Sequence, residues 1–320
     1  MRMAKARAGG HVTLLFSIHS QSTNPLEQGS RGVGFCLQQG AEAIATISPT
    51  SSEESELSVS VIDWDGTTAP SECVDPYLVL CEELSKLCEF TCIGKQIDLS
   101  LQLELPRSQG FGMSAAGLLA SAEALLKASE IDDTQIAATA AHLVERRLSS
   151  GLGDVLALCT GGVELRLQPG APFSVGEAVG FDVSIKPILV WSAGAGKHTA
   201  DYIDDDTWKA SISAAGEDAV ERLRGGKWDS NKWPTIISES IEFAEQSGLL
   251  GEPHRLDLLD SVNSILQSCN LMHTHVALLC MLGTSVAILP RSLANESEEQ
   301  IEQICLQLAQ HQLEFIPAFV

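Results

Sequence analysis

The sequence predicts an α+β fold with two domains, and three observations support this prediction. Apolar and polar residues alternate from 97 to 105 (IDLSLQLEL), which is the period of a strand with one buried face. Strand-like and helix-like segments follow one another without strict alternation, so we expect helices to cover one face of each sheet. The 320 residues are enough for two cores. The turn sequence QPGAP at 168–172 predicts a boundary between domains at 1–170 and 171–320.

The first half of the chain is predicted to mix strands with helices. Pro106 ends the alternating strand, and a helix is expected to begin at Asp75 and Pro76, with Asp75 as its cap and Pro76 in its first turn. Ser114 is also a residue type that caps a helix, and the Gly-bearing stretch 151–162 is interpreted as a loop. The predicted strands are 11–18, 33–38, 43–47, 57–62, 97–105 and 163–167. The predicted helices are 75–90, 114–129 and 132–148.

The second half follows the same mixed pattern. Ser297, with Gln300 three residues later, is typical of the start of a helix. The predicted strands are 183–191, 275–280 and 284–289. The predicted helices are 206–224, 234–247, 255–268 and 297–310.

Composition and charge exclude several classes of function. The formal net charge of −22 argues against a nucleic-acid partner, because phosphate backbones are bound by clusters of Lys and Arg. No apolar run is long enough to cross a membrane, and the N-terminal sequence MRMAKARAGG lacks the apolar core of a signal peptide. The nine cysteines form no CxxC pair, which favours reduced thiols over a metal site. We therefore expect a cytoplasmic protein without a nucleic-acid or membrane partner.

The stretch PRSQGFGMSAAG at 106–117 joins a predicted strand to a predicted helix. Its glycines let the backbone curl so that several N–H groups point into one concavity. The helix that follows adds free N–H groups and the positive end of its dipole, which together favour an anion. On these grounds alone, a phosphate site and a plain capped connection are equally supported. Ser114 would hold Mg²⁺ through its hydroxyl in the first case, or cap the helix.

Several segments together resemble the motifs of one enzyme superfamily. PRSQGFGMSAAG resembles the second motif of the GHMP kinases, ARAGGHVTLLFSI (6–18) the first and CMLGTSVAIL (280–289) the third. Within that superfamily the chain is most similar to the archaeal pantoate kinases. The segments that carry this likeness, in the same order and spacing, are AGGH (8–11), GSRGVG (29–34), GFGMSAAG (110–117), GLGDV (151–155), GG (161–162) and PGAP (169–172). One departure is Gly9, where the first motif has a proline.

The resemblance implies a fold and an activity. It implies the two-domain GHMP kinase fold, with an N-terminal β/α domain like that of a ribosomal protein and a C-terminal ferredoxin-like α+β domain. It also implies ATP and Mg²⁺, with D-pantoate as the acceptor of a phosphoryl group on its 4-hydroxyl, for coenzyme A biosynthesis. A homodimer is the usual arrangement of the family.

The resemblance also implies the residues of the site. Ser114 and Glu145 are expected to hold Mg²⁺, and Asp154 to accept or orient the proton of the substrate hydroxyl. A carboxylate substrate requires a cationic fork, which Arg166 or Arg31 would supply: Arg166 corresponds to an arginine of the pantoate kinase pattern, and Arg31 lies in the GSRGVG turn. The remaining expected substrate-binding residues are Ser30 and His11. The expected ATP-binding residues are Gly110, Phe111, Gly112, Met113, Ser114 and Ala115, and the catalytic ones Asp154, Ser114, Glu145 and Arg166.

Each assignment has an alternative. Glu145 is also explained as a solvated partner of Arg146 or Arg147, Asp154 as a helix cap, and either substrate arginine as part of a surface salt bridge. Two other functions are open as well. The acceptor could be mevalonate-like or homoserine-like, or the chain could bind nucleotide without catalysis.

Overall fold

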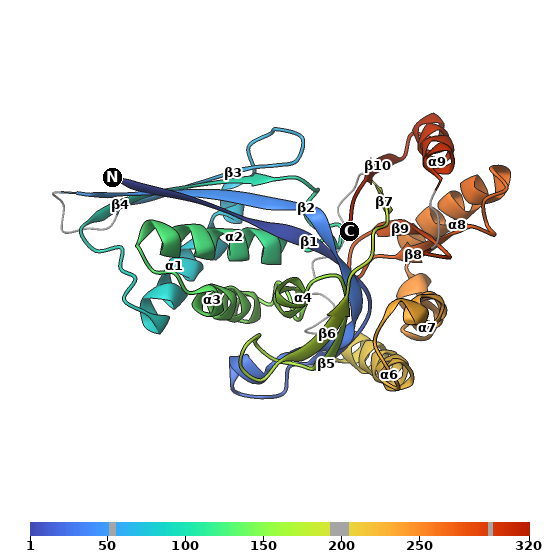
Figure 1. Ribbon diagram of the computed structural model, residues 1–320, viewed down its shortest axis with the longest axis horizontal. Coiled ribbons are helices and arrows are strands. Elements are labelled where there is room, and N and C mark those ends of the chain that lie inside the picture. The colour runs from blue at the N-terminus through green and yellow to red at the C-terminus, as the bar shows by residue number, and fades with distance from the viewer. Residues whose placement is uncertain (51–55, 193–204, 294–296) are drawn as a thin grey trace.

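The computed structural model describes residues 1–50, 56–192, 205–293 and 297–320 (Figure 1). Within these ranges the strands form a six-stranded and a four-stranded sheet. The larger sheet, with its helices, makes up one end of an elongated molecule, and the smaller sheet and the last helices make up the other (Figure 1). None of the helices in these ranges is both long and apolar enough to cross a membrane.

The larger sheet is built on a long antiparallel hairpin. Strands follow the order β3-β4-β2-β5-β6, with β1 paired to β2. Pairing of β1 with β2 is interrupted between Gly9 and His11 and between Thr13 and Leu15. The strands are β1 (Arg2–His19), β2 (Gly29–Pro49), β3 (Glu56–Ile62), β4 (Lys95–Leu103), β5 (Val163–Gln168) and β6 (Glu177–Phe181).

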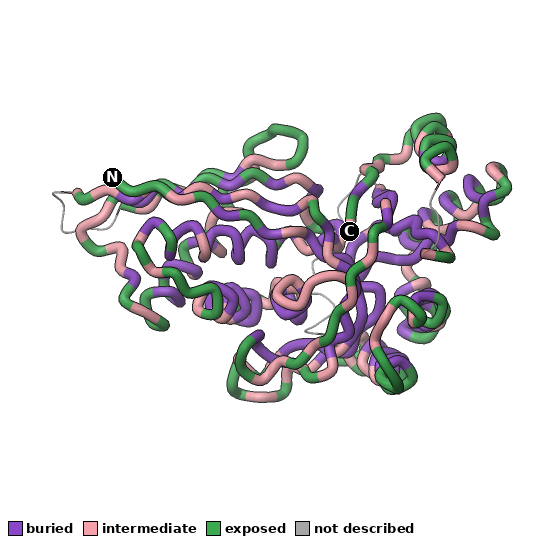
Figure 2. The backbone as a smooth tube through the Cα atoms, in the orientation of Figure 1, coloured by how far each residue is buried: buried purple, intermediate pink, exposed green. Residues whose placement is uncertain are grey.

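Helices cover one face of this sheet, as the alternating pattern predicts. Ile97, Leu99, Leu101 and Leu103 of β4 are buried beneath them. Figure 2 shows α2 buried along nearly all of its length between the sheet and its neighbours, which explains its content of Ala and Leu. The helices are α1 (Asp75–Leu87), α2 (Met113–Ala128), α3 (Thr134–Arg147) and α4 (Asp154–Thr160). Short 3₁₀ turns lie at η1 (Pro25–Glu27) and η2 (Ser71–Cys73).

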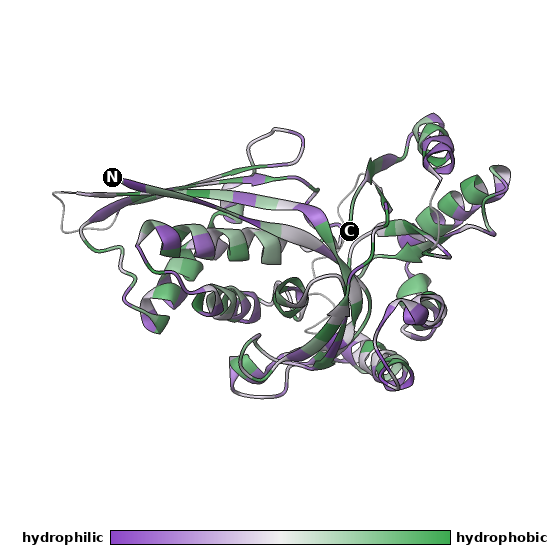
Figure 3. Cartoon of the chain, in the orientation of Figure 1, coloured by the Kyte–Doolittle hydropathy of each residue, from purple (hydrophilic) through white to green (hydrophobic). Residues whose placement is uncertain are grey.

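The smaller sheet has the order β10-β7-β9-β8. Its strands are β7 (Ile188–Trp191), β8 (His275–Leu279), β9 (Ser285–Pro290) and β10 (Glu314–Pro317). The helices of this half carry hydrophilic and hydrophobic residues on the same turns, as helices with one buried side do (Figure 3). They are α6 (Asp206–Leu223), α7 (Trp233–Gln246), α8 (Pro253–Ser268) and α9 (Glu298–Gln310), with 3₁₀ turns η3 (Ser230–Lys232) and η4 (Leu249–Gly251).

The predicted α+β fold is confirmed, and the errors have local causes. The strands predicted at 33–38 and 43–47 are one strand, because Gly40 permits a close approach to the backbone of Ala8 and does not make a turn. Within 151–162, predicted as loop, α4 forms a single short helix. The short strands β6 and β10 were not predicted. Strand β6 pairs with β5 in the larger sheet. The boundary predicted between domains 1–170 and 171–320 stays a prediction.

Two predicted helix caps are wrong. Helix α2 begins at Met113 after Gly112, which adopts the left-handed conformation and makes no side-chain cap bond, so Ser114 lies inside the first turn. Helix α1 likewise follows Val74, and Asp75 is its first helical residue. In both cases the serine or aspartate is one or two positions too late to cap.

Candidate active site

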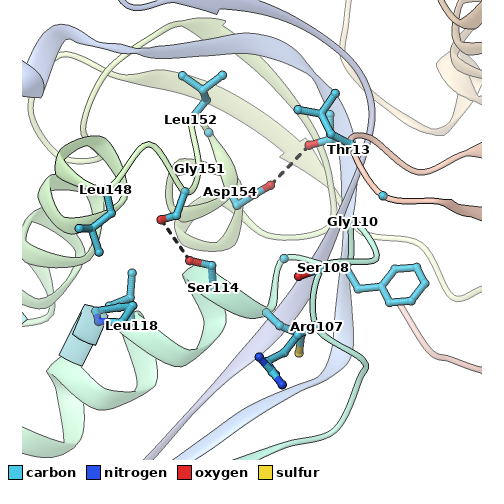
Figure 4. Close-up of a pocket in the computed structure, with 18 of the residues that line it drawn as sticks. Thr13, Arg107, Ser108, Gly110, Ser114, Leu118, Leu148, Gly151, Leu152 and Asp154 are labelled. Carbon is cyan, nitrogen blue, oxygen red and sulfur yellow. Dashed lines mark hydrogen bonds between the residues drawn. The ribbon is translucent and has the colours of Figure 1, made fainter. Parts of the chain in front are cut away.

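A pocket of about 450 Å³ opens where the 106–117 loop meets the segment after α3 (Figure 4). Its lining combines polar side chains, such as those of Ser114 and Asp154, with aromatic and apolar ones, such as those of Tyr77 and Leu118. The other lining residues are Thr13, Phe16, Ser30, Val61, Cys73, Pro76, Leu103, Arg107, Ser108, Gly110–Met113, Leu148–Gly153, Arg166 and Met281–Gly283. The pocket therefore draws on the three segments that resemble GHMP motifs and on GSRGVG and GLGDV, whereas GG (161–162) and PGAP (169–172) contribute no lining residue.

The glycines of the 106–117 loop are required by close packing. Gly110 and Gly112 have φ values of 77° and 69°, which favour glycine. A Cβ on Gly112 would come 2.8 Å from the His11 nitrogen, and one on Gly110 would come 3.0 Å from the Gly283 nitrogen. The loop is thus held between β1 and the segment that precedes β9.

Hydrogen bonds fix the loop in this position. The His11 amide donates to the Phe111 carbonyl over 3.1 Å, and the Ser285 hydroxyl donates to the Gln109 carbonyl. The first turn of α2 comes immediately after the loop, and its backbone N–H groups, which have no acceptor within the helix, are of the kind that bind anions at helix N-termini. Gly110, Phe111, Gly112, Met113 and Ser114 line the pocket, whereas Ala115 is fully buried and does not.

Glu145 lies buried next to Ser114. Its side chain is almost inaccessible, and its Oε1 atom has no hydrogen-bond partner within the described ranges. Burial, and then the charge of Asp154, raise the pKa of Glu145 to about 8, against the opposing effects of Arg146 and of the Ser114 hydroxyl. The alternative of a solvated partner of Arg146 or Arg147 is wrong, because Glu145 is buried, and Arg147 pairs with Glu82 and Glu83 instead.

A buried carboxyl with an unpaired oxygen atom, such as that of Glu145, is suited to bind a cation. An oxygen-only pair of Glu145 and Ser114 suits Mg²⁺, which typically keeps several waters and phosphate oxygens as its other ligands. No cluster of three or more His, Cys, Asp and Glu side chains in the described ranges could hold a metal by itself. A bound Mg²⁺ would therefore depend on ligands from outside the chain as well.

Asp154 is the first residue of α4 and faces the pocket. Gly153 is the residue before the helix and no side chain caps it, so the cap alternative for Asp154 is wrong. Its Oδ1 atom accepts hydrogen bonds from His11 Nδ1 over 2.6 Å and from the Thr13 hydroxyl over 3.5 Å. Burial opposes the charged form, but the bond and charge of His11 outweigh it and lower the pKa of Asp154. The carboxylate is ionised at neutral pH.

Arg166 reaches the same pocket from β5. Its guanidinium donates to Glu164 Oε1 over 2.9 Å, while its Nε has no partner within the described ranges. A Cβ on Gly153 would come 2.9 Å from that Nε atom and closer still to the Ser30 hydroxyl. Arg166 and Ser30 therefore meet at the residue before Asp154, where they can receive an anionic group of a ligand.

Two expected substrate-binding residues lie outside the pocket lining. His11 is fully buried, and its second ring nitrogen, Nε2, lies 3.1 Å from Glu164. Arg31 pairs through its guanidinium with Glu217 and Glu221 of α6 and donates its Nε–H to the Leu167 carbonyl. The structure does not bring either side chain to the pocket, because carboxylates of the protein already occupy their donors.

Sequence reasoning missed two residues of this site, Glu164 and Thr13. Glu164 and Arg166 are separated by one residue on a strand, so their side chains share a face. Two opposite charges on one face of an otherwise apolar strand could have predicted that Glu164 and Arg166 form a buried ion pair. Thr13 gave no such signal, because its hydroxyl matters only through partners distant in sequence.

Comparison with known proteins agrees with this geometry. Residues 77–162 match the GHMP kinases N terminal domain. The chain is 28% identical over 301 residues to the pantoate kinase of Thermococcus kodakarensis, which covers 93% of this chain and 91% of the relative. It is 26% identical over 250 residues to the pantoate kinase of Methanocaldococcus jannaschii, covering 77% and 81%.

Solved structures extend the likeness to nearly the whole chain. A phosphotransferase related to the CoA biosynthesis pathway superposes with a TM-score of 0.77 at 25% identity, covering 99% of this chain and 96% of the other. The L. major mevalonate kinase in complex with R-mevalonate, at 15% identity and a TM-score of 0.64, covers 99% and 95% and shares the fold. The resemblance predicted from the motifs is confirmed: the chain is similar to the GHMP kinases within residues 77–162 and to pantoate kinases over most of its length.

Proposed function

We propose that this protein transfers the γ-phosphoryl group of ATP to the 4-hydroxyl of D-pantoate, giving 4-phosphopantoate for coenzyme A biosynthesis. Relatives named pantoate kinase align with most of the chain, and the similarity to the structure of a phosphotransferase related to the CoA biosynthesis pathway supports the same pathway. The observation that carries the proposal is that Asp154 and Arg166 line one pocket with the 106–117 loop. A hydroxy acid offers one group to each of them.

The loop and the start of α2 would bind the triphosphate. Curled amides at Gly110–Met113 and the helix dipole favour the phosphate charges. Ser114 and Glu145 would hold Mg²⁺, which supplies neutralisation of the charge on the phosphates when bound. The pocket thus binds phosphate at one end and keeps the acceptor at the other.

Asp154 would orient the acceptor hydroxyl. The acceptor oxygen forms a bond to the γ-phosphorus as the bond to the bridging oxygen of ADP breaks, and the hydroxyl proton passes to the Asp154 carboxylate. A low pKa keeps that carboxylate ionised and ready to accept a hydrogen bond. A weak base suffices, because a loose transition state requires little early deprotonation.

Arg166 would bind the acceptor carboxylate, with the Ser30 hydroxyl beside it. Guanidinium offers parallel donors that match a carboxylate. We assign this role to Arg166 and not to Arg31, because Arg31 is already paired with two glutamates of α6. The homodimer and the cytoplasmic location stay predictions.

A coupled assay of ADP release over a panel of hydroxy acids tests the proposal. We expect turnover with D-pantoate to exceed that with mevalonate or homoserine by at least about a hundredfold in kcat/KM, since both ends of the acceptor are recognised. Turnover with mevalonate and not with D-pantoate would show that the acceptor is mevalonate-like. Binding of ATP without turnover of any acceptor would favour a protein that binds nucleotide without catalysis.

A further inference from the structure

Four alternating charges connect the two polar groups of the pocket. Asp154 contacts His11 over 2.6 Å, His11 contacts Glu164 over 3.1 Å, and Glu164 contacts Arg166 over 2.9 Å. Asp154 and Arg166 line the pocket, and His11 and Glu164 do not; of the four, only Asp154 is not fully buried. We call these four residues the charge row.

The geometry of the row fixes the charge of His11. A carboxylate can only accept hydrogen bonds, and each ring nitrogen of His11 faces a carboxylate oxygen. Both nitrogens therefore carry a proton, and the ring is an imidazolium. The charged or titratable groups around it are Asp154 of α4, Glu164 and Arg166 of β5, Cys36 of β2 and Glu145 of α3.

Glu164 connects the two halves of the row through a single atom. Its Oε1 accepts from both His11 and Arg166, while its Oε2 has no partner within the described ranges. The neighbouring strand β2 leaves room for this arrangement. A Cβ on Gly34 would come 2.5 Å from His11 Nε2, and one on Gly32 would come 2.7 Å from a terminal nitrogen of Arg166. A Cβ at Gly34 or Gly32 would also come 2.2 or 2.3 Å from a backbone carbonyl oxygen of β1, so the backbone and the charge row both require glycine at these positions.

We propose that Glu164 is a positioning residue for phosphoryl transfer. Through Arg166 it fixes the group that receives the acceptor carboxylate, and through His11 it fixes the group that orients the acceptor hydroxyl. This inference rests on the proposed function. Because one buried carboxylate holds both ends, the pocket is set for acceptors whose carboxylate and hydroxyl have one fixed separation, which is a property of a particular hydroxy acid.

Two substitutions separate the arms of the row. Glu164→Gln keeps the shape but removes the charge that both neighbours require, so we expect the acceptor KM to rise and kcat to fall, each by about tenfold or more. His11→Gln leaves the Glu164–Arg166 pair intact, so we expect kcat to fall by about tenfold with the acceptor KM changed less than about threefold. The dissociation constant of a nonhydrolysable ATP analogue should stay within about twofold in both variants.

A matched control is Glu239→Gln. Glu239 is another buried carboxylate paired with an arginine, Arg222, but it lies on α7 outside the pocket. If Glu164 were merely structural, Glu164→Gln would behave like this control: the active fraction would fall, and the acceptor KM would not change. An unchanged acceptor KM in Glu164→Gln, or an equal loss of affinity for the ATP analogue, would overturn the proposal.

The remaining outcomes are also decisive. Should Glu164→Gln not fold, His11→Gln decides the question, because an unchanged kcat there would show that the row does not act on Asp154. The kcat and the acceptor KM of each variant are compared with those of the wild type, using whichever hydroxy acid of the panel the wild type phosphorylates. Failure of the wild type to use pantoate would thus count against the proposed substrate and not against the positioning role.

Discussion

The carboxyl of Glu145 packs directly against the α-carbon of Gly151. A Cβ at Gly151 would come 2.6 Å from Oε2 of that carboxyl and nearer still to Oε1. The glycine is needed there because it leaves room for a buried acid, so the GLGD sequence serves the site twice. Its first glycine admits Glu145, and its last residue, Asp154, faces the pocket.

Gly151→Ala should therefore damage the cation site while sparing the fold. The added methyl group displaces the Glu145 carboxyl, so we expect the Mg²⁺ concentration for half-maximal activity to rise about tenfold and kcat to fall by a similar factor. Kinetics at varied Mg²⁺ measure this. Gly225→Ala is the control, because a Cβ at that position meets nothing within 4 Å. Equal Mg²⁺ dependence in the two variants would contradict the assignment of Glu145.

Asp154→Asn tests the orienting carboxylate. The amide keeps the shape but is a poor acceptor for the hydroxyl proton and disturbs the contact with His11, so we expect kcat to fall by about 10²–10⁴-fold. Binding of an ATP analogue, followed by calorimetry, should not change. The exposed Asp182→Asn serves as control. Near-normal turnover in Asp154→Asn would remove this residue from the mechanism.

Most of the helices and strands could be predicted from the sequence, because the patterns that indicate them depend on residues close together in the chain. The alternation at 97–105 and the Ala- and Leu-rich pattern of α2 reflect burial on one face or on nearly all faces, and each depends only on neighbours in sequence. Short elements carry too few residues for such a pattern. Strand β6 is half exposed at a sheet edge, and α4 follows directly after a glycine turn.

The residues of the site could be predicted only in part from the sequence, because their contacts join segments that are far apart in the chain. Pocket residues such as Ser114, Asp154 and Arg166 belong to motifs whose residue types indicate their chemistry. Their surroundings depend on contacts far apart in the chain. Arg31 is turned away by glutamates of α6, more than 180 residues later in sequence, a pairing that no local pattern indicates. The burial of His11 between two carboxylates is likewise a property of the folded sheet.

Substitution of the two arginines should distinguish their roles. Arg166→Lys keeps a charge but loses the planar fork, so we expect the pantoate KM to rise about a hundredfold. Arg31→Lys weakens the contacts with α6, so we expect a lower unfolding temperature and a pantoate KM within about threefold of wild type. Steady-state kinetics and thermal unfolding of both variants give the comparison. A large rise of KM in Arg31→Lys alone would exchange the two assignments.

The charge of His11 should make stability depend on pH in the alkaline range. Burial disfavours the imidazolium, but the carboxylates of Glu164 and Asp154 outweigh burial and raise the pKa of His11 from 6.5 to about 9. The folded state thus holds a proton that the unfolded state releases above 6.5. The stabilisation is complete below pH 6.5 and is lost as pH rises through 9, by about 3 kcal/mol in all.

Urea unfolding at pH 6.5, 8 and 9 measures that loss together with the loss from Glu145, whose raised pKa of about 8 acts in the same direction, and NMR titration of the histidine rings isolates the part due to His11. The His11 resonance is assigned by its disappearance in His11→Gln and should titrate near 9. His142 provides the opposite internal reference, because burial lowers its pKa to about 4. Buried thiols such as Cys280, whose pKa burial raises to about 12, add to the loss only above the ordinary thiol pKa. A His11 ring that titrates at or below 6.5 would show that the two carboxylates do not hold it as a cation.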